Sequence, residues 1–569
     1  MTYRSLLSLD IGSQHTRAWL YDNTSGNYQL VGSGEAQSTI AGGENLLSGV
    51  WRACERLQDG TGRRLLDHNG RLIVGQESPD KGVEKVGLSL SAGPRIKTAL
   101  IGLTDKSSLT GIRKLASLFY TEETAMLSLS DGLDATHQLE SLMQADADLI
   151  ILAGGDNQGA SKPLVAAVEN IRLVYSHLPR LYKPQIVYAG NHALLEGITK
   201  LLDAGDDLHL APNIHPEFGM EDLIGAWGAM LDAFERIRLR QLSGLQELKT
   251  MLGVRIIPTA FAMGRMVRYL DQISKVDKGV MALDVGAGST MLVASKSSKF
   301  TTMLTRTPIG VDVGEKTCYW SSFPLDVESV AEYMLNKSLH PAFMASTLED
   351  LAIEHAWTRV RLQDAFAKTA DLYKDFGYDP DEGLNDVYEP IILSGESLTN
   401  VPTIGQQFLM ALDGLKPHGI TTLVLDKGQI LASLGSLAEI EPVLPVQILD
   451  NGVFKNLGTV ICAESPAKEG QKIMSIEIAR EEEEREIHEI KKGSIKRYDV
   501  KPGTKARIYL APELETDVGM GHEGLGGWVS VSGSEIGVVI DARGRPLNMH
   551  GSTEARSEII RNWLWELGG

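Results

Sequence analysis

A short pattern that occurs twice, half a chain apart, constrains the fold more than any other feature. In each copy an apolar strand ends in an aspartate, and a glycine-containing turn and a second apolar strand follow; the copies are residues 6–20 and 280–295. The matching positions are Asp10 with Asp284, Gly12 with Gly286 and Thr16 with Thr290. A repeat at this separation indicates that one domain has been duplicated within the chain.

The residues of each turn suit a phosphate group. An aspartate at the end of a strand can hold a hydrated Mg²⁺, and glycines let backbone N–H groups approach phosphate oxygens without a Cβ in the way. Neighbouring hydroxyl groups add further donors. Apart from the two aspartates, the candidate phosphate-binding residues are Gly12, Ser13, Thr16, Gly286, Gly288, Ser289 and Thr290. A single turn of this kind can simply join two strands, so it is the second copy that favours a phosphate site.

A third motif completes a possible nucleotide site. Residues 391–398 form an apolar strand that runs into Gly395, Glu396 and Ser397 ahead of a helix. Together with the two turns, this resembles the actin, Hsp70 and sugar-kinase superfamily, in which two lobes clamp ATP and a strand–glycine–helix motif holds the adenosine. The resemblance implies that Gly395 and Ser397 bind the nucleotide. Glu396 stands where that superfamily usually has a second glycine, and its side chain could crowd or repel a nucleotide.

The same resemblance implies the chemistry. ATP and Mg²⁺ are the expected cofactors. Asp10 and Asp284 are the expected catalytic residues and hold the Mg²⁺ through water.

Composition narrows the class of partner. The chain has 569 residues with 55 Lys and Arg against 74 Asp and Glu, which gives a formal net charge of −19. Such a charge disfavours nonspecific binding to nucleic acid or to an anionic membrane and leaves a small molecule or a protein as partner. The sequence has neither a signal-peptide pattern nor an apolar run of membrane-spanning length, so we expect a cytoplasmic protein.

Strand and helix patterns predict an α/β fold. We expect two duplicated actin-like ATPase lobes of the ribonuclease H-like type, an inserted α/β subdomain and a C-terminal all-β domain. The insertion is expected because strand and helix patterns alternate from residue 86 onward, and the β-rich end because short alternating strands follow a segment rich in proline and acids at 439–445. The expected boundaries are 1–85 with 204–275 for lobe I, 86–203 for the inserted subdomain, 276–440 for lobe II and 441–569 for the C-terminal domain.

Three stretches of the insertion carry a narrower resemblance. Residues 89–103, 153–159 and 187–191 are similar to the glutamate mutase L family, also called MutL or GlmL and unrelated to the mismatch-repair protein of that name. At 153–159 the family usually has Ala-Gly-Gly-Thr-Asp-Gly-Gly, where this chain has Ala-Gly-Gly-Asp-Asn-Gln-Gly. The resemblance implies an accessory chaperone that reactivates an adenosylcobalamin-dependent mutase. The Asp-x-His-x-x-Gly signature of cobalamin-binding domains is not evident, so we expect the partner to carry the cobalamin.

Three functions therefore remain open at the level of sequence. The first is an ATP-binding and weakly ATP-hydrolysing reactivase for a mutase of the glutamate mutase type. The second is a small-metabolite kinase of the same superfamily, which needs a carboxylate base near the γ-phosphate. The third is a non-catalytic actin-like scaffold, which Glu396 favours most. The sequence does not predict the oligomeric state.

Overall fold

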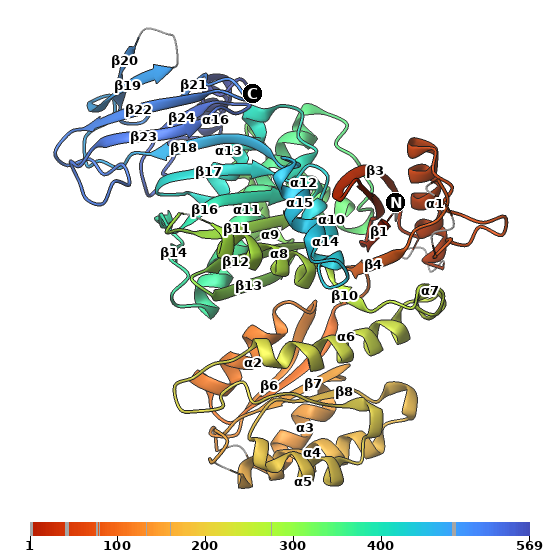
Figure 1. The fold of residues 1–569 in the computed structure, drawn as a ribbon. Coiled ribbons are helices and arrows are strands. Elements are labelled where there is room, and N and C mark those ends of the chain that lie inside the picture. Colours follow the sequence, from red (N-terminus) through yellow and green to blue (C-terminus); the bar gives the residue numbers. More distant parts are fainter. Residues whose placement is uncertain are drawn as a thin grey trace. The chain divides into compact units, whose positions relative to one another are not determined.

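The computed structural model describes residues 4–39, 45–75, 78, 80–132, 134–159, 161–274, 276–480 and 485–569 (Figure 1). The chain divides into two compact units. Unit 1 contains Met1–Met263 and Ala432–Ile448, and unit 2 contains Gly264–Leu431 and Leu449–Gly569. All three boundaries between them fall inside helices, namely α8 (Thr259–Ile273), α14 (Ile430–Leu437) and α15 (Val443–Asp450).

The main sheet of unit 1 has five strands in the order β10-β4-β1-β2-β3. Their bounds are β1 Arg4–Ile11, β2 His15–Thr24, β3 Asn27–Gln37, β4 Lys85–Leu90 and β10 Ile256–Pro258. Strands β1, β2 and β3 are antiparallel, whereas β4 and β10 run parallel to β1. The central β1 is buried on both faces after its first residue, as its continuous apolar run predicts, whereas β3 alternates between buried and exposed residues. Helix α1 (Leu47–Thr61) packs against β2 and β3.

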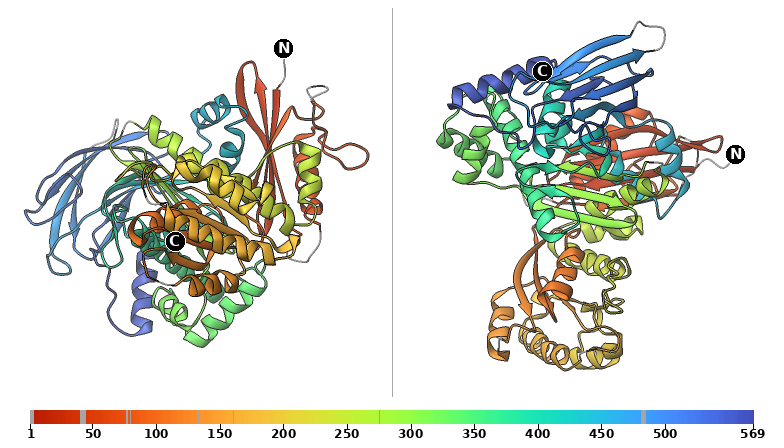
Figure 2. Two further views of the ribbon diagram at one scale, coloured as in Figure 1. Left: turned by 90° about the horizontal axis from the view of Figure 1, so that it is seen from below. Right: turned by 90° about the vertical axis from the view of Figure 1, so that its left-hand side faces the viewer.

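The insertion of unit 1 is a parallel five-stranded sheet in the order β6-β5-β7-β8-β9. Its strands are β5 Ile96–Gly102, β6 Thr121–Ser128, β7 Leu149–Ala153, β8 Gln185–Tyr188 and β9 Leu208–Leu210. Its helices are α2 Thr110–Ala116, α3 Ala135–Gln144, α4 Lys162–His177, α5 Leu195–Leu202 and α6 Trp227–Gln241, and α7 Leu245–Leu252 follows α6. Helices α3, α4 and α5 cover one face of this sheet and α6 lies on the other, so the sheet is buried on both sides (Figures 1 and 2).

Unit 2 begins with a sheet of the same design. Strands β13-β12-β11-β16-β17 are neighbours in this order; β11, β12 and β13 are antiparallel, and β16 and β17 run parallel to β11. The bounds are β11 Gly279–Val285, β12 Ser289–Lys296, β13 Lys299–Arg306, β16 Tyr388–Ser394 and β17 Gly419–Leu425. Its helices are α9 Val311–Tyr319, α10 Val327–Leu339, α11 Leu348–Leu372, α12 Glu396–Thr399 and α13 Ile404–Leu415, and a two-residue pair, β14 Tyr378–Asp379 with β15 Gly383–Leu384, lies between α11 and β16.

The two main sheets therefore share one strand order and one pattern of directions. In each, the first strand of the sheet lies third in the order and carries the aspartate of the repeated motif at its carboxyl end. This is the duplicated actin-like ATPase fold of the ribonuclease H-like type that the repeat predicts.

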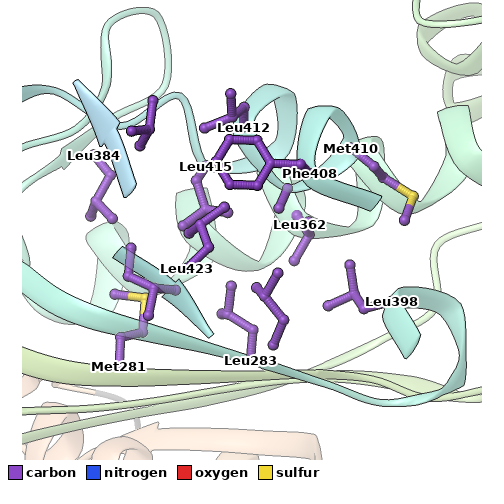
Figure 3. Close-up of a cluster of buried hydrophobic side chains, with 14 of the residues drawn as sticks. Met281, Leu283, Leu362, Leu384, Leu398, Phe408, Met410, Leu412, Leu415 and Leu423 are labelled. Carbon is purple, nitrogen blue, oxygen red and sulfur yellow. The ribbon is translucent and has the colours of Figure 1, made fainter. Parts of the chain in front are cut away.

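The sheet of unit 2 continues beyond β17. Strand β18 (Lys455–Cys462) pairs antiparallel with β17, and β24 (Val538–Asp541) and β21 (Ile495–Tyr498) extend the sheet to eight strands. Figure 3 shows part of the apolar cluster beneath it, with Leu283, Leu362, Phe408 and Leu423 pointing toward one another. Residues from beyond position 450 complete this cluster: Leu457, Val460, Cys462, Ile495, Ile536, Val539 and Leu567.

The remaining C-terminal residues form a second, antiparallel sheet in the order β20-β19-β22-β23. Its strands are β19 Lys472–Arg480, β20 Glu486–Lys491, β22 Lys505–Pro512 and β23 Gly527–Ser532, and the chain ends with α16 Thr553–Glu566. One apolar cluster joins this sheet to β18 and β24. The C-terminal region is thus rich in β-structure, as the short alternating strands predict.

The structure divides the chain differently from the expected boundaries. Strand β4, expected in the insertion, belongs to the main sheet of unit 1, and β9 extends the insertion's sheet past residue 203. Residues 443–445, the end of the expected linker, lie in helix α15 (Val443–Asp450), and Gln447 accepts a hydrogen bond from Tyr28 N at 2.7 Å. These differences arise because strand pairing is decided by contacts between distant segments, which local composition does not record.

Within the residues that the structure describes, no helix is long and apolar enough to cross a membrane.

Candidate functional site

The first turn begins with a buried carboxylate. Asp10, at the end of β1, is 5% exposed and lies opposite Ser89 of the parallel strand β4. Ser89 Oγ and Thr259 Oγ1 each donate a hydrogen bond of 2.6 Å to Asp10 Oδ1. Thr259 begins α8 directly after β10. The three hydrogen-bonded residues, Asp10, Ser89 and Thr259, thus lie at the carboxyl ends of the neighbouring parallel strands β1, β4 and β10. Such an edge is where open α/β sheets bind ligands.

Burial perturbs this carboxylate. It raises the pKa of Asp10, and the hydrogen bonds from Ser89 and Thr259 oppose that rise. Both hydroxyls donate to the same oxygen, Oδ1. An oxygen donor of this kind suits Mg²⁺ or one of its bound waters, so the residues present fit the metal implied by the fold.

The turn that follows Asp10 is closed by its own backbone and by one hydroxyl. Gly12 N donates to His15 O at 2.9 Å, and Ser38 Oγ donates to Gly12 O at 2.7 Å. A Cβ on Gly12 would lie 2.7 Å from His15 O, so only glycine fits there without movement of the turn. Ser13 is exposed, whereas Thr16 is 1% exposed and its hydroxyl is 2.8 Å from Ser38 Oγ. The Thr16 hydroxyl therefore lies inside the fold, where it supports the turn.

The second turn repeats this geometry. Asp284 ends β11 opposite Ser394 of β16, and Gly286 N donates to Ser289 O at 3.0 Å. Gly288 is exposed, and a Cβ built on it would meet no atom within 4 Å. Thr290 is fully buried, and its Oγ1 has no hydrogen-bond partner among the described residues. The backbone of residues 286–289 is thus open on one side, as a phosphate-binding turn requires.

A buried arginine lies behind the second turn. Arg361 of α11 is 4% exposed, and its Nη2 donates to Gly286 O and, at 3.1 Å, to Ser289 O. Its Nη1 donates to Ser397 Oγ at 3.3 Å. Burial lowers the pKa of Arg361 to about 10, and the negative charge of Asp284 opposes this shift. The guanidinium therefore remains a cation at neutral pH.

The third motif lies against the second turn. Gly395 has φ of +84°, and a Cβ on it would lie 2.4 Å from Val285 N, so this position requires glycine for two separate reasons. Glu396 begins α12 and is half-buried. Because Glu396 occupies a helical position and not a left-handed one, its backbone does not need the second glycine usual in the superfamily.

The structure groups the predicted residues within each unit. Asp10, Gly12, Ser13 and Thr16 lie together in unit 1, and the candidates numbered 284 to 397 lie together in unit 2. Sequence reasoning missed Ser38, Ser89, Thr259 and Arg361. Ser89 opens one of the stretches similar to the glutamate mutase L family, which was a usable signal, whereas nothing in the pattern of α11 distinguishes Arg361 from a surface arginine.

Comparisons with known proteins agree with the narrower resemblance. The family model described as MutL protein matches residues 6–453. Among curated proteins, none matches this chain.

Solved structures give weak likenesses. An ATP-dependent caprolactamase from Pseudomonas jessenii is 13% identical, with 85% of this chain and 81% of that chain covered and a TM-score of 0.33. A nucleotide-free acetone carboxylase is 12% identical (87% and 82% covered, TM-score 0.30). A nucleotide-free diol dehydratase-reactivating factor is 12% identical (77% and 99% covered, TM-score 0.29). These TM-scores are below 0.5, so the activities of those proteins do not carry over to this chain.

The family match spans most of the chain, including both aspartate–glycine turns and the third motif, and this protein therefore belongs to the MutL protein family, the glutamate mutase L family.

Proposed function

We propose that this protein binds and slowly hydrolyses Mg-ATP and uses that cycle to reactivate an adenosylcobalamin-dependent mutase of the glutamate mutase type. The observation that carries the nucleotide half is the repeated group of a strand-end aspartate, a glycine turn and an opposing serine, in Asp10–Gly12–Ser89 and Asp284–Gly286–Ser394. Membership of the glutamate mutase L family supports the partner half.

The residues divide the work as follows. Backbone N–H groups of the two turns bind phosphate oxygens. Gly288 leaves open space beside the second turn, and Gly12 and Gly286 close their turns through hydrogen bonds to His15 O and Ser289 O. Asp10 and Asp284 hold Mg²⁺ through water, and the ion, when bound, neutralises charge on the phosphates. Ser89 and Thr259 keep the Asp10 carboxylate in one orientation. Gly395 and Ser397 bind the adenosine part of the nucleotide.

The partner is a protein. The inserted α/β sheet of unit 1 and the β20-β19-β22-β23 sheet of unit 2 lie outside the two duplicated main sheets, so we propose that one or both contact the mutase. The nucleotide state biases the protein toward one conformation and so changes its affinity for the mutase, because a ligand shifts an equilibrium only by its differential affinity for the two states.

The test is a reactivation assay. A purified mutase is inactivated by turnover, the protein is added with Mg-ATP and fresh adenosylcobalamin, and recovery of mutase activity is followed. Recovery with ATP, and none with ADP or with the Asp10→Asn variant, supports the proposal. No recovery, together with equal affinity for the mutase in the ATP and ADP states, contradicts it. Phosphate transfer to a metabolite instead of release of inorganic phosphate would identify a kinase.

A further inference from the structure

The two turns are held from behind by different chemistry. In each, the carbonyl oxygen of the first glycine accepts a hydrogen bond from a side chain. In unit 1 the donor is a neutral hydroxyl, Ser38 Oγ, which lies 2.7 Å from Gly12 O. In unit 2 the donor is a guanidinium, Arg361 Nη2, which binds both Gly286 O and Ser289 O. The duplicated fold thus contains one turn with a cation behind it and one with a hydroxyl in the same place.

The Arg361 side chain is built into the protein and cannot turn toward solvent. It is 4% exposed, its guanidinium lies 5.9 Å from the ring centroid of Trp357, and its Nε has no hydrogen-bond partner among the described residues. Leaving a buried donor of a cation unpaired costs free energy, so the position is retained at a cost in stability. Its hydrogen bonds go to the second turn and to Ser397 of the third motif.

We infer that Arg361 is a positioning residue for a nucleotide polyphosphate: it fixes the turn at 286–289, adds positive charge behind it and ties it to Ser397. This inference deepens the proposed function and rests on it for the identity of the ligand. By holding the carbonyls of Gly286 and Ser289 on the buried side, the guanidinium pre-organises the backbone on the open side of the turn. Its charge acts on phosphate through a protein interior in which water screens little.

A purely structural role is the alternative, and the chain offers a matched control. Arg359 lies two residues before Arg361 on the same helix and is 3% exposed. Its Nε donates a hydrogen bond to Asp413 Oδ2 at 2.8 Å. No contact joins Arg359 to the turn in the described part of the chain. Arg359→Gln therefore removes an equally buried guanidinium from α11 without touching the candidate site.

The experiment measures Mg-ATP and Mg-ADP affinity by calorimetry for the full chain and for Arg361→Gln, Arg361→Lys and Arg359→Gln, with melting temperatures for each. Arg361→Gln is expected to weaken Mg-ATP binding about 10- to 100-fold, the usual loss for hydrogen bonds from a charged group. Arg361→Lys keeps the charge without the forked pair of donors, so its affinity for Mg-ATP is expected to lie between those of the unaltered protein and Arg361→Gln. Arg359→Gln is expected to lower the melting temperature and leave both affinities unchanged.

A second readout needs no nucleotide. Hydrogen exchange of a peptide spanning residues 284–291 in the nucleotide-free protein should be faster in Arg361→Gln than in Arg359→Gln. Equal exchange in the two variants, or equal loss of affinity in both, overturns the inference. If the unaltered protein binds no Mg-ATP, the proposed function fails, and the exchange comparison still decides whether Arg361 positions the turn.

Discussion

Ser89 donates a hydrogen bond of 2.6 Å to the buried carboxylate of Asp10, because the parallel register of β1 and β4 places the two residues side by side. In unit 2 the register of β11 and β16 places Ser394 opposite Asp284 in the same way. A buried carboxylate costs stability unless other groups bind it. At Asp10 the hydrogen bonds from Ser89 and Thr259 offset part of this cost, and burial still raises the pKa of the carboxyl.

Asp10→Asn should separate folding from function. The amide oxygen can still accept the hydrogen bonds from Ser89 and Thr259, and the buried charge is removed, so the melting temperature in Mg-free buffer should not fall. ATP turnover should fall about 100-fold or more, because a carboxylate at the phosphates acts electrostatically. Phosphate release and thermal unfolding measured on one preparation check this. Unchanged ATP turnover in Asp10→Asn would mean that Asp10 takes no part in ATP hydrolysis.

Asp426 should make stability depend on pH. It is fully buried after β17 and accepts hydrogen bonds from Ile430 N and Leu431 N at 2.8 and 2.9 Å. Burial raises its pKa to about 6, and these hydrogen bonds oppose the rise. Because the folded-state pKa is raised, the stability contributed by Asp426 is present below its ordinary value of about 4 and is lost as the pH rises through about 6.

Asp426→Asn loses one of the two accepting oxygens at every pH, but it also removes the charge, so its melting temperature relative to the unaltered protein should rise between pH 4 and pH 7. Asp134 is the control of opposite sign. It is an exposed helix cap that accepts from His137 N at 2.9 Å, and this hydrogen bond lowers its pKa. Its contribution is present above the ordinary pKa and lost in acid, so Asp134→Asn should lower stability at neutral pH. Melting curves across this pH range measure both variants, and a pH-independent difference for Asp426→Asn would contradict the first expectation.

Substitution by alanine should destabilise the protein strongly at one glycine of the candidate site and leave its stability unchanged at another. Gly395→Ala forces a left-handed conformation and places a Cβ 2.4 Å from Val285 N, so the protein should lose several kcal/mol of stability, about 3 or more, or fail to fold. Gly288→Ala meets open space, and its stability should stay within about 0.5 kcal/mol. Denaturant unfolding measures both. Equal losses would mean that the turn and the third motif do not pack as described.

Removing residues 455–569 should abolish cooperative folding of unit 2. The cut leaves the β17 edge unpaired and takes Leu457, Ile495 and Val539 out of the cluster that contains Leu283 and Phe408. An exposed apolar edge strand favours aggregation. Size-exclusion chromatography and calorimetry of the fragment 1–454 provide the measurement. A soluble fragment with one cooperative melting transition would show that the C-terminal strands are an independent domain.

Local sequence patterns are enough to predict the strands and turns of both lobes. Strands such as β1 and β11 are predictable because each is a continuous apolar run that ends in an aspartate and a glycine, and the spacing of the two runs indicates the duplication. The candidates in the two turns rest on the same letters, and it is the second copy that favours a phosphate site over an ordinary turn between strands. Membership of the glutamate mutase L family is likewise recognised from the sequence.

The side chains that support those turns are set by contacts between segments far apart in the chain. Ser89 and Thr259 lie 79 and 249 positions from Asp10 along the chain, and Arg361 lies 75 from Gly286. No local periodicity connects such positions, and the charge of a helical arginine gives no sign that it is buried. The sequence places a domain boundary near residue 440, whereas β18 joins the sheet of unit 2 by pairing with β17, a contact that local composition does not record. Local patterns determine which strands form, whereas the contacts between distant strands and helices determine which edges pair and which charges are enclosed.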